Sequence, residues 1–481
     1  MAERVEILYG PSSVIYGSDA FSAVINIIPK RPQADKKQFG VRLGYGSFNT
    51  NDYYAEGLVS NSDSFSVTVM GRVYNSDGFR FPYTGSYAPI KQYPNPLVPQ
   101  MLQSINDHNL FANISYQNFH FGYFKRQFNE GSATGLTPRL YVYNDESKWI
   151  AQDNIFWLDY TYDLGKFGEI NADITYSHFK LMPETQFLLF TQSTGFNREY
   201  MTGLDQSIRI KTTYNVDLLY DFKVTSGIEY TYIDSIPPFA NISLYGEPVK
   251  FIGNVRKNIE KNKKVFDNHV AVFGQVSYTP ISSFALICGT RFDYSQQSEK
   301  SFNPRLAALF RPSSMTTLRL TYGTAFQAPS LYYRFEQFDT PRAVLTPEDR
   351  HVLRLGNQTI KAYEFSLTQG IANSVMLEAS AFYNDARNLI SRVKYSSSTY
   401  STKYDMYTEG LRNENVGAQR ALGAFLKSTI RIVDGVDIML HYNYTDAKMK
   451  AHFNTEKRFV ELPRCAKYKL LARVMLRKKY F

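Results

Sequence analysis

Apolar and polar side chains alternate with a period of two in segments of roughly ten residues, from residue 38 almost to the end of the chain. Successive side chains of a strand point to opposite faces, so this alternation is typical of strands with one apolar and one polar face. In the segment 436–444, one face would hold Val436, Ile438, Leu440, Tyr442 and Tyr444, and the other Asp437, Met439, His441 and Asn443. The pattern predicts an all-β chain.

The connections between these segments are alternately short and long, apart from a short first hairpin near 47–50. Short polar turns are predicted near 60–64, 117–119, 163–168, 215–222, 280–283, 312–315, 370–374 and 432–435. Long connections are predicted near 75–107, 128–150, 180–203, 234–267, 295–301, 326–357, 391–412 and 447–465. A soluble β-sandwich has no reason to keep its long loops at one end. We therefore predict a large transmembrane antiparallel up-and-down β-barrel of about eighteen strands.

The composition agrees with a barrel whose strands cross a membrane. Aromatic residues make up 15% of the chain, with 37 Tyr and 35 Phe, which suits the aromatic girdles of such barrels. No stretch approaches the roughly 18 uninterrupted apolar residues of a membrane helix, which excludes a helical membrane protein. The mean hydropathy of −0.34 is compatible with a barrel because lumen-facing side chains lower the average.

The net charge of +10 is spread among acidic residues along the chain, which argues against a nucleic-acid partner. The densest basic run is interpreted as a solvated loop or, on a cell surface, as a contact for lipopolysaccharide phosphates or an anionic ligand; it comprises Arg256, Lys257, Lys261, Lys263 and Lys264. Cys288 and Cys465 are too few for a disulfide framework. We find no catalytic constellation and no metal-ligand spacing, so the sequence predicts neither an enzyme nor a cofactor.

The segment before the alternating region has its own local order. Residues 2–30 read AERVEILYGPSSVIYGSDAFSAVINIIPK. The part 4–9 alternates as a strand, Gly10 and Pro11 provide turn geometry, and Ser12 is expected to cap a short helix that ends at Tyr16. Gly17 begins the next turn, and 24–28 is predicted to be a second strand.

The conjunction of GPSS, YGSDA and VINII in this segment resembles the signature that closes the plug of TonB-dependent outer-membrane receptors. Segments resembling the family's barrel follow in family order, among them FNPRLAALFRP, LRLTYGTAFQAPSL and NENVGAQRALGAFL. The resemblance implies that residues 1–37 are the C-terminal part of a plug and that residues 38–481 are the barrel. The plug-signature positions are Arg4, Glu6, Gly10, Pro11, Tyr16 and Gly17. Arg4 and Glu6 match family positions that lock plug to wall; by residue chemistry alone they would form a surface ion pair.

The resemblance also implies a function: TonB-driven import of a scarce bulky ligand, most of all a ferric siderophore, across the outer membrane of a Gram-negative bacterium. The implied partners are TonB, the ligand, and outer-membrane lipid with lipopolysaccharide. The alternative is a passive porin, and a cobalamin or haem receptor is a lesser one. His351, between FQAP and GNQ, resembles the haem-receptor layout. Candidate ligand contacts in the long loops are Arg80, Tyr83, Tyr87, Arg139, Tyr141, Arg334 and His351.

Family barrels have 22 strands and a plugged lumen, so we expect about four strands to be missing after residue 481. The front of the plug, which would engage TonB, and a secretory signal are expected to be missing before residue 1. The chain alone is therefore expected not to transport. We also predict that the loops at 75–107, 234–267 and 326–357 gather at one end, opposite the turns at 163–168 and 370–374.

Alternation further predicts which side chains share a face of the barrel wall. The lumen face is predicted to hold Asp437, His441, Asn443, Lys469 and Arg473. The lipid face is predicted to hold Val436, Ile438, Leu440, Leu470 and Val474.

Overall fold

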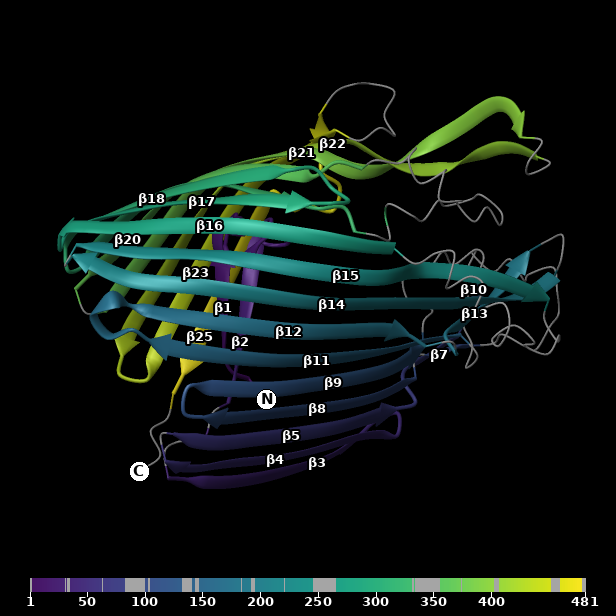
Figure 1. Cartoon of the computed structure of the whole chain (residues 1–481), viewed down its shortest axis with the longest axis horizontal. Helices are drawn as coiled ribbons and strands as arrows, with labels where there is room; N and C mark the ends of the chain where they lie inside the picture. The colour runs from purple at the N-terminus through teal and green to yellow at the C-terminus, as the bar shows by residue number, and fades with distance from the viewer. Residues whose placement is uncertain are drawn as a thin grey trace.

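The computed structural model describes residues 2–30, 32, 35–62, 64–82, 100–102, 104–131, 141–142, 147–182, 184–191, 195–219, 221–244, 265–330, 333, 355–372, 374–401, 406–450 and 459–477. The chain begins with a two-stranded sheet of β1 (Ala2–Tyr9) and β2 (Ala23–Pro29), joined through the short helix α1 (Ser13–Tyr16). We call this unit the inner hairpin. It lies inside the curved wall that the remaining strands form (Figure 1).

The wall is one sheet of 21 described strands, in which β10 (Tyr141–Val142), β13 (Gln186–Thr191) and β24 (Val460–Glu461) are short side strands. The other eighteen agree with the predicted number: β3 (Lys37–Gly46), β4 (Thr50–Ser62), β5 (Phe65–Ser76), β8 (Ile105–Tyr116), β9 (Phe119–Gly131), β11 (Lys148–Asp163), β12 (Glu169–Leu181), β14 (Gly195–Leu219), β15 (Phe222–Leu244), β16 (Val265–Ile281), β17 (Phe284–Ser295), β18 (Ser301–Ser313), β19 (Thr316–Gln327), β20 (Gln358–Ile371), β21 (Val375–Ser401), β22 (Met406–Val433), β23 (Val436–Lys450) and β25 (Tyr468–Leu476). A separate small hairpin is made of β6 (Arg80–Pro82) and β7 (Gln100–Leu102), and a 3-10 turn, η1 (Gly165–Phe167), joins β11 to β12.

Neighbouring wall strands are antiparallel, and all eight predicted tight turns lie between them. The strand direction therefore reverses at each step, so the tight turns share one end of the wall and the long connections leave from the other (Figure 1). The central parts of the loops at 75–107, 234–267 and 326–357 lie outside the described residues, but the strands that lead into them, β5, β15 and β19, all start at tight turns and end at the opposite side of the wall, as predicted.

Three connections were predicted to be too long, and in the one near 234–267 the strand β15 continues to Leu244. The one near 180–203 is largely strand, because β14 already begins at Gly195 and pairs with β13. In the one near 391–412, β21 continues to Ser401 and β22 starts at Met406. The arms of these hairpins hydrogen-bond to each other beyond the wall, where neither face needs to be apolar. The alternation that marks strands in the sequence is therefore lost.

Register establishes which wall face looks toward the inner hairpin. A Cβ added at Gly323 on β19 would lie 3.5 Å from the carbonyl oxygen of Pro11, so this position faces the hairpin. Directly paired residues share a face, and the pairing from Gly323 runs through Ala362, Asn384, Ala421 and Ala447. Position 447 and its alternate neighbours on β23 therefore face inward.

This register confirms the predicted division of side chains. Asp437, His441 and Asn443 share the inward face with Ala447, and Lys469 and Arg473 join them by pairing with Asn443 and Met439. The opposite, outward face holds Val436, Ile438, Leu440, Leu470 and Val474.

Aromatic rings from neighbouring strands pair with each other on the outward face. Near the tight turns, Phe119 and Tyr160 lie 4.4 Å apart between ring centroids, and Phe222 and Tyr278 lie 4.3 Å apart. Closer to the long connections, the ring of Phe156 stacks on Tyr123 at 4.5 Å. Aromatic rings on the outward face of the strands are typical of a membrane-spanning barrel.

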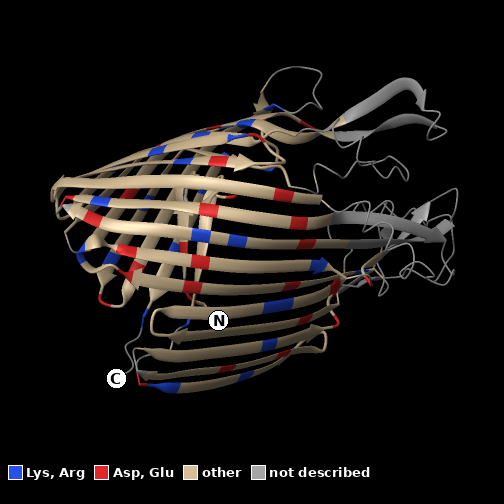
Figure 2. Ribbon diagram, viewed as in Figure 1, with Lys and Arg blue, Asp and Glu red and all other residues tan. Residues whose placement is uncertain are grey.

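Charged residues are scattered along the strands and do not gather in a single block (Figure 2). Among the described residues, no helix has the length and apolar character needed to cross a membrane.

Candidate functional site: the contact between inner hairpin and wall

The inner hairpin is held in shape by its own backbone hydrogen bonds. The amide of Gly10 donates to the carbonyl of Ser22, and the amide of Ser12 to that of Ala20, each across 3.0 Å. Gly10 and Gly17 adopt positive φ angles of 83° and 84°, a region that residues with a Cβ rarely enter. The predicted side-chain cap by Ser12 is wrong, because its hydroxyl donates to the Gly10 carbonyl at 3.4 Å instead. A tight turn competes here with the helix end for the same hydroxyl.

The tip of the hairpin is pressed against one side of the wall. Ser12, Ser13, Val14 and Ala20 are all buried. A Cβ at Gly289 on β17 would lie 3.1 Å from a methyl group of Val14, so the missing side chain there makes room for the hairpin. Phe21 packs on a buried cluster of three wall residues on β19, β20 and β21: Ala325, Ile360 and Ala386.

One wall side chain bonds directly to the hairpin backbone. The Nζ of Lys211 on β14 donates to the carbonyl oxygen of Ile15 at 3.0 Å. Its ammonium also lies 5.1 Å from the ring centroid of Phe273 on β16, a cation–π distance. The carbonyl belongs to the last turn of α1, which leaves acceptors without an intrahelical partner. The lysine supplies the missing donor.

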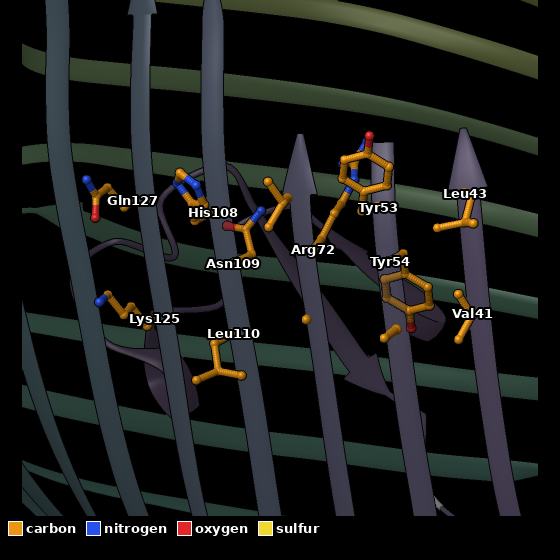
Figure 3. A pocket seen from close by; sticks show the side chains of 13 residues that line it. Val41, Leu43, Tyr53, Tyr54, Arg72, His108, Asn109, Leu110, Lys125 and Gln127 are labelled. Atoms are coloured by element: carbon orange, nitrogen blue, oxygen red, sulfur yellow. The ribbon is translucent and has the colours of Figure 1, made fainter. Parts of the chain in front are cut away.

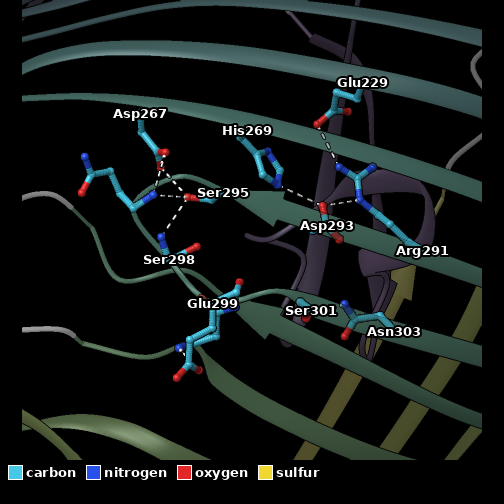
Figure 4. Close-up of polar contacts among 12 residues, drawn as sticks. Glu229, Asp267, His269, Arg291, Asp293, Ser295, Ser298, Glu299, Ser301 and Asn303 are labelled. Carbon is cyan, nitrogen blue, oxygen red and sulfur yellow. Dashed lines mark hydrogen bonds and ion pairs between the residues drawn. The ribbon is translucent and has the colours of Figure 1, made fainter.

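Beside this bond lies a buried cluster of charges from β15, β16 and β17 (Figure 4). Arg291 is fully buried; its Nη2 lies 3.0 Å from Oε1 of Glu229, and its Nε lies 2.8 Å from Oδ1 of Asp293. The Nε2 of His269 is 3.1 Å from the same Asp293 oxygen. A Cβ at Gly17 would lie 3.3 Å from Nη2 of Arg291, so the hairpin covers the cluster.

The cluster is well paired but not fully satisfied. Nη1 of Arg291 and Oδ2 of Asp293 are buried without a hydrogen-bond partner among the described residues. A buried charge that loses its partner costs about 3–5 kcal/mol, so the three ionic side chains depend on one another. The cluster gives the hairpin a rigid polar seat.

A second attachment lies at the other end of the hairpin. Nζ of Lys30, just after β2, contacts both oxygens of Glu56 on β4, at 3.0 and 2.9 Å. Tyr54 donates its hydroxyl to the same carboxylate at 2.5 Å. The hairpin is therefore fixed to β4 at one end and to β14–β21 at the other.

Arg4 and Glu6 form a 2.8 Å ion pair on β1, with side chains 59% and 44% exposed. Glu6 also accepts a 3.1 Å bond from Asn26 of β2. The Arg4 guanidinium holds the pKa of Glu6 below its usual value. Among the described residues, their ionic and hydrogen-bond partners lie within the hairpin, and the role in locking the hairpin to the wall stays a prediction. Tyr16, the last residue of α1, is half exposed.

The candidate ligand contacts in the loops fall mostly outside the described residues; these are Tyr83, Tyr87, Arg139, Arg334 and His351. Arg80 lies in β6 and pairs with Leu102, and Tyr141 lies in β10 and pairs with Leu189. The basic run at 256–264 is likewise outside the described part. Within that part, no group of three or more His, Cys, Asp or Glu side chains could hold a metal ion.

The residues predicted from the sequence did not include Lys211, Glu229, His269, Arg291 or Asp293. One signal was present: Arg291 and Asp293 are two residues apart in the otherwise apolar strand FALICGTRFDYS, so they share a face. Charges at alternate positions of such a strand indicate a polar inward site.

A cavity of about 670 Å³ lies across β3, β4, β5, β8 and β9 (Figure 3). Most of its lining, including Val41, Leu43, Ala55, Leu110 and Lys125, belongs to the outward face by register. It is therefore not a pocket in the lumen beside the hairpin.

Comparison with known proteins gives a consistent picture. A family model described as "TonB dependent receptor-like, beta-barrel" matches residues 102–464. The iron-regulated outer membrane virulence protein of Vibrio cholerae is 20% identical over 96% of this chain, and the chain spans 65% of that protein's length. The vitamin B12 transporter BtuB of Vibrio vulnificus is 23% identical over 85% of this chain and 58% of its own.

Two solved structures share the fold. The siderophore receptor PirA of Acinetobacter baumannii aligns with a TM-score of 0.66 at 15% identity, covering 98% of this chain and 70% of its own. A mutant of the ferric enterobactin receptor PfeA of Pseudomonas aeruginosa aligns with a TM-score of 0.67 at 15% identity. The alignment covers 95% of this chain and 71% of the PfeA chain.

Proposed function

Because the chain belongs to the TonB-dependent receptor β-barrel family, we propose that it forms the wall and the closing part of the plug in a receptor that imports a scarce, bulky ligand. Members of this family are non-enzymatic proteins of the Gram-negative outer membrane, and the chain is one of them. The transport activity, its ligand and its energy source are the proposed part.

In this proposal, residues 1–37 are the C-terminal part of the plug and residues 38–481 are the barrel. The division is supported by the hydrogen bonding, since β1 and β2 pair only with each other among the described strands, whereas the wall begins with β3 at Lys37.

The observation that carries the proposal is the double attachment of the inner hairpin, by Lys211 to Ile15 and by Lys30 to Glu56. A passive porin keeps its lumen open, whereas a segment fixed to the wall at both ends obstructs it. Passage of a bulky ligand then requires work on the hairpin. In this proposal that work is delivered through TonB from the inner-membrane proton gradient.

A ferric siderophore is the proposed ligand. The supporting observations are an iron-regulated relative, structural neighbours named as siderophore receptors, and one named as a ferric enterobactin receptor. Cobalamin is the second candidate, because one relative is named a vitamin B12 transporter. The predicted ligand contacts remain the loop residues Arg80, Tyr83, Tyr87, Arg139, Tyr141, Arg334 and His351.

The test is to delete the gene in its host and to measure accumulation of radiolabelled ferric siderophores, haem and cobalamin, with and without a proton-gradient uncoupler. The proposal predicts loss of uncoupler-sensitive uptake of one ferric siderophore. Loss of cobalamin or haem uptake alone would assign a different ligand. Lost uptake that is insensitive to the uncoupler would favour the porin.

A further inference from the structure

Arg305 on β18 lies beneath the tip of the inner hairpin without a partner for its charge. Among the described residues it forms neither an ion pair nor a side-chain hydrogen bond, and its Nε is buried without an acceptor. Arg305 pairs in register with Gly289 on β17 and with Gly323 on β19, two positions that face the hairpin. Directly paired residues share a face, so the side chain of Arg305 also points inward.

Other inward cations on nearby strands have acceptors. Arg291 lies within 3.0 Å of two carboxylates, and Lys211 donates to a carbonyl of the hairpin. Arg319 lies 3.1 Å from Oε1 of Glu364. The carboxylates of these pairs are already engaged by their own cations. A cation that is partly shielded from water without a counter-charge is costly, so Arg305 requires an anion that the described residues do not supply.

The hairpin crosses directly over Arg305. A Cβ at Gly323 would lie 3.5 Å from the carbonyl oxygen of Pro11, and a Cβ at Gly289 would lie 3.1 Å from a methyl group of Val14. These two wall positions flank Arg305, so the hairpin residues between Pro11 and Val14 pass above it. Because neither flanking position carries a side chain, the guanidinium has room between the wall and the hairpin.

Two hydroxyl groups of the hairpin belong to the same contact. Tyr16, at the end of α1, is close enough to Arg305 for an electrostatic interaction between them. Its hydroxyl forms no hydrogen bond among the described residues. Ser13, next to Val14, is fully buried, and its Oγ also has no partner in the described part of the chain. The contact therefore offers several hydrogen-bond donors and no acceptor with a negative charge.

The end of the Arg305 side chain can be reached by a small anion. Only Nε of the guanidinium is fully enclosed; Nη1 and Nη2, which have no partner among the described residues, keep contact with the surrounding space. A guanidinium can bind both oxygens of one carboxylate or phosphate group side by side. Since Tyr16 is half exposed as well, both groups are accessible while the hairpin stays docked.

We propose that Arg305 and the hydroxyl of Tyr16 bind an oxyanion, either a phosphate or a carboxylate group, between the hairpin tip and the wall. Arg305 belongs to the wall and Tyr16 to the hairpin, so an anion held by both joins the two parts. Such a ligand binds the docked hairpin better than the displaced one and therefore stabilises docking. The site is distinct from the Arg291 cluster, whose carboxylates repel anions, and the proposal does not depend on which ligand is imported.

The test uses the purified protein in detergent and measures amide hydrogen exchange of residues 10–23 at constant pH and ionic strength. Chloride is replaced in part by inorganic phosphate or by citrate. At an anion concentration of about ten times the Kd, exchange of the hairpin should become about tenfold slower. Slowing by phosphate alone would identify inorganic phosphate as the ligand. Slowing by citrate alone would identify the carboxylates of an organic molecule, and slowing by both a general oxyanion site.

Variants separate this site from a general effect of salt. Arg305→Gln should abolish the slowing, and Tyr16→Phe should weaken it by a few fold. Arg305→Lys keeps the charge without the planar guanidinium and should retain part of the slowing, which keeps the test decisive if Arg305→Gln folds poorly. The matched control is Arg209→Gln, which removes an inward arginine already paired with Asp173 and should respond to the anion like wild type. No slowing of wild type by either anion, or equal slowing in wild type and Arg305→Gln, would overturn the proposal.

Discussion

The ammonium of Lys211 on the barrel wall donates a 3.0 Å hydrogen bond to the backbone carbonyl of Ile15 in the inner hairpin. Because Ile15 lies in α1 at the hairpin tip, this bond joins the two parts of the molecule where the hairpin is most buried. Replacing Lys211 with Met removes the donor and keeps most of the apolar stem.

We expect Lys211→Met to cost about 1–3 kcal/mol in hairpin docking, the penalty of a partly buried acceptor left unpaired. Amide hydrogen exchange of residues 10–23 should become faster while the wall amides keep their protection. Lys223→Met is the control, because Lys223 is 69% exposed at the tight-turn end and pairs only with exposed Asp217 among the described residues. Unchanged exchange in Lys211→Met would contradict the role of this bond.

The two positive-φ glycines of the hairpin form a matched pair. Gly10→Ala should cost about 1–2 kcal/mol, from backbone strain alone, because its added Cβ would meet nothing within 4 Å. Gly17→Ala should cost more, because φ 84° with ψ −159° is a conformation essentially reserved for glycine and because the added Cβ would lie 3.3 Å from Nη2 of Arg291. Hydrogen exchange of the hairpin measures both. Equal effects would mean that Gly17 does not press on the buried charges.

Breaking the buried charge cluster should destabilise the fold more than breaking the exposed ion pair Arg4–Glu6. Arg291→Met leaves Glu229 and Asp293 buried without their cation and should destabilise the fold by about 3–5 kcal/mol. Arg4→Met breaks a solvent-exposed pair, which water screens, and should change the stability little. Urea unfolding in detergent, followed by gel mobility of the folded form, compares the two.

A double variant tests whether the cluster acts as a unit. Adding Glu229→Gln to Arg291→Met removes one of the stranded carboxylates and should recover part of the lost stability. If the two losses simply add, Arg291 and Glu229 are not coupled.

The assignment of wall faces predicts a contrast between neighbours on β23. Ile438 faces outward and Met439 inward by register. Ile438→Arg places a charge against lipid and should cost about 2–4 kcal/mol if it lies near the membrane centre. Met439→Arg points into the lumen and should cost much less. The measurement is the yield of folded protein in outer membranes, judged by heat-modifiable gel mobility. A lower yield for Met439→Arg than for Ile438→Arg would reverse the assignment of the two faces.

Much of the wall was predictable because one physical constraint repeats along it. Each strand between lipid and lumen must alternate, so the residues of the segment 436–444 could be assigned to faces from their order in the chain alone. The eight tight turns followed from the breaks in that alternation. The strand arms near 195–203, 235–244 and 391–412 were not predicted, because a hairpin outside the membrane does not need an apolar face.

The seat of the hairpin was harder to predict. Glu229, His269 and Arg291 lie on three different strands, and their closeness depends on the register between those strands. Alternation gives the face of each residue but not its height relative to a neighbour on another strand. The close approach of the hairpin at Gly289 likewise appears only when the hairpin is in place.

The inner hairpin sits on β14–β21, and in the proposed function it must leave this position for a ligand to pass. The most direct measurement is a disulfide between Val14→Cys and Gly289→Cys, since a Cβ at Gly289 lies 3.1 Å from a Val14 methyl group. The native thiols are first removed by Cys288→Ser and Cys465→Ser. Uptake of the imported ligand is then measured in cells after oxidation and again after reduction. We predict that the disulfide forms, abolishes uncoupler-sensitive uptake and releases it on reduction. Full uptake with the disulfide closed, or failure of the two cysteines to join in the folded protein, would contradict the account.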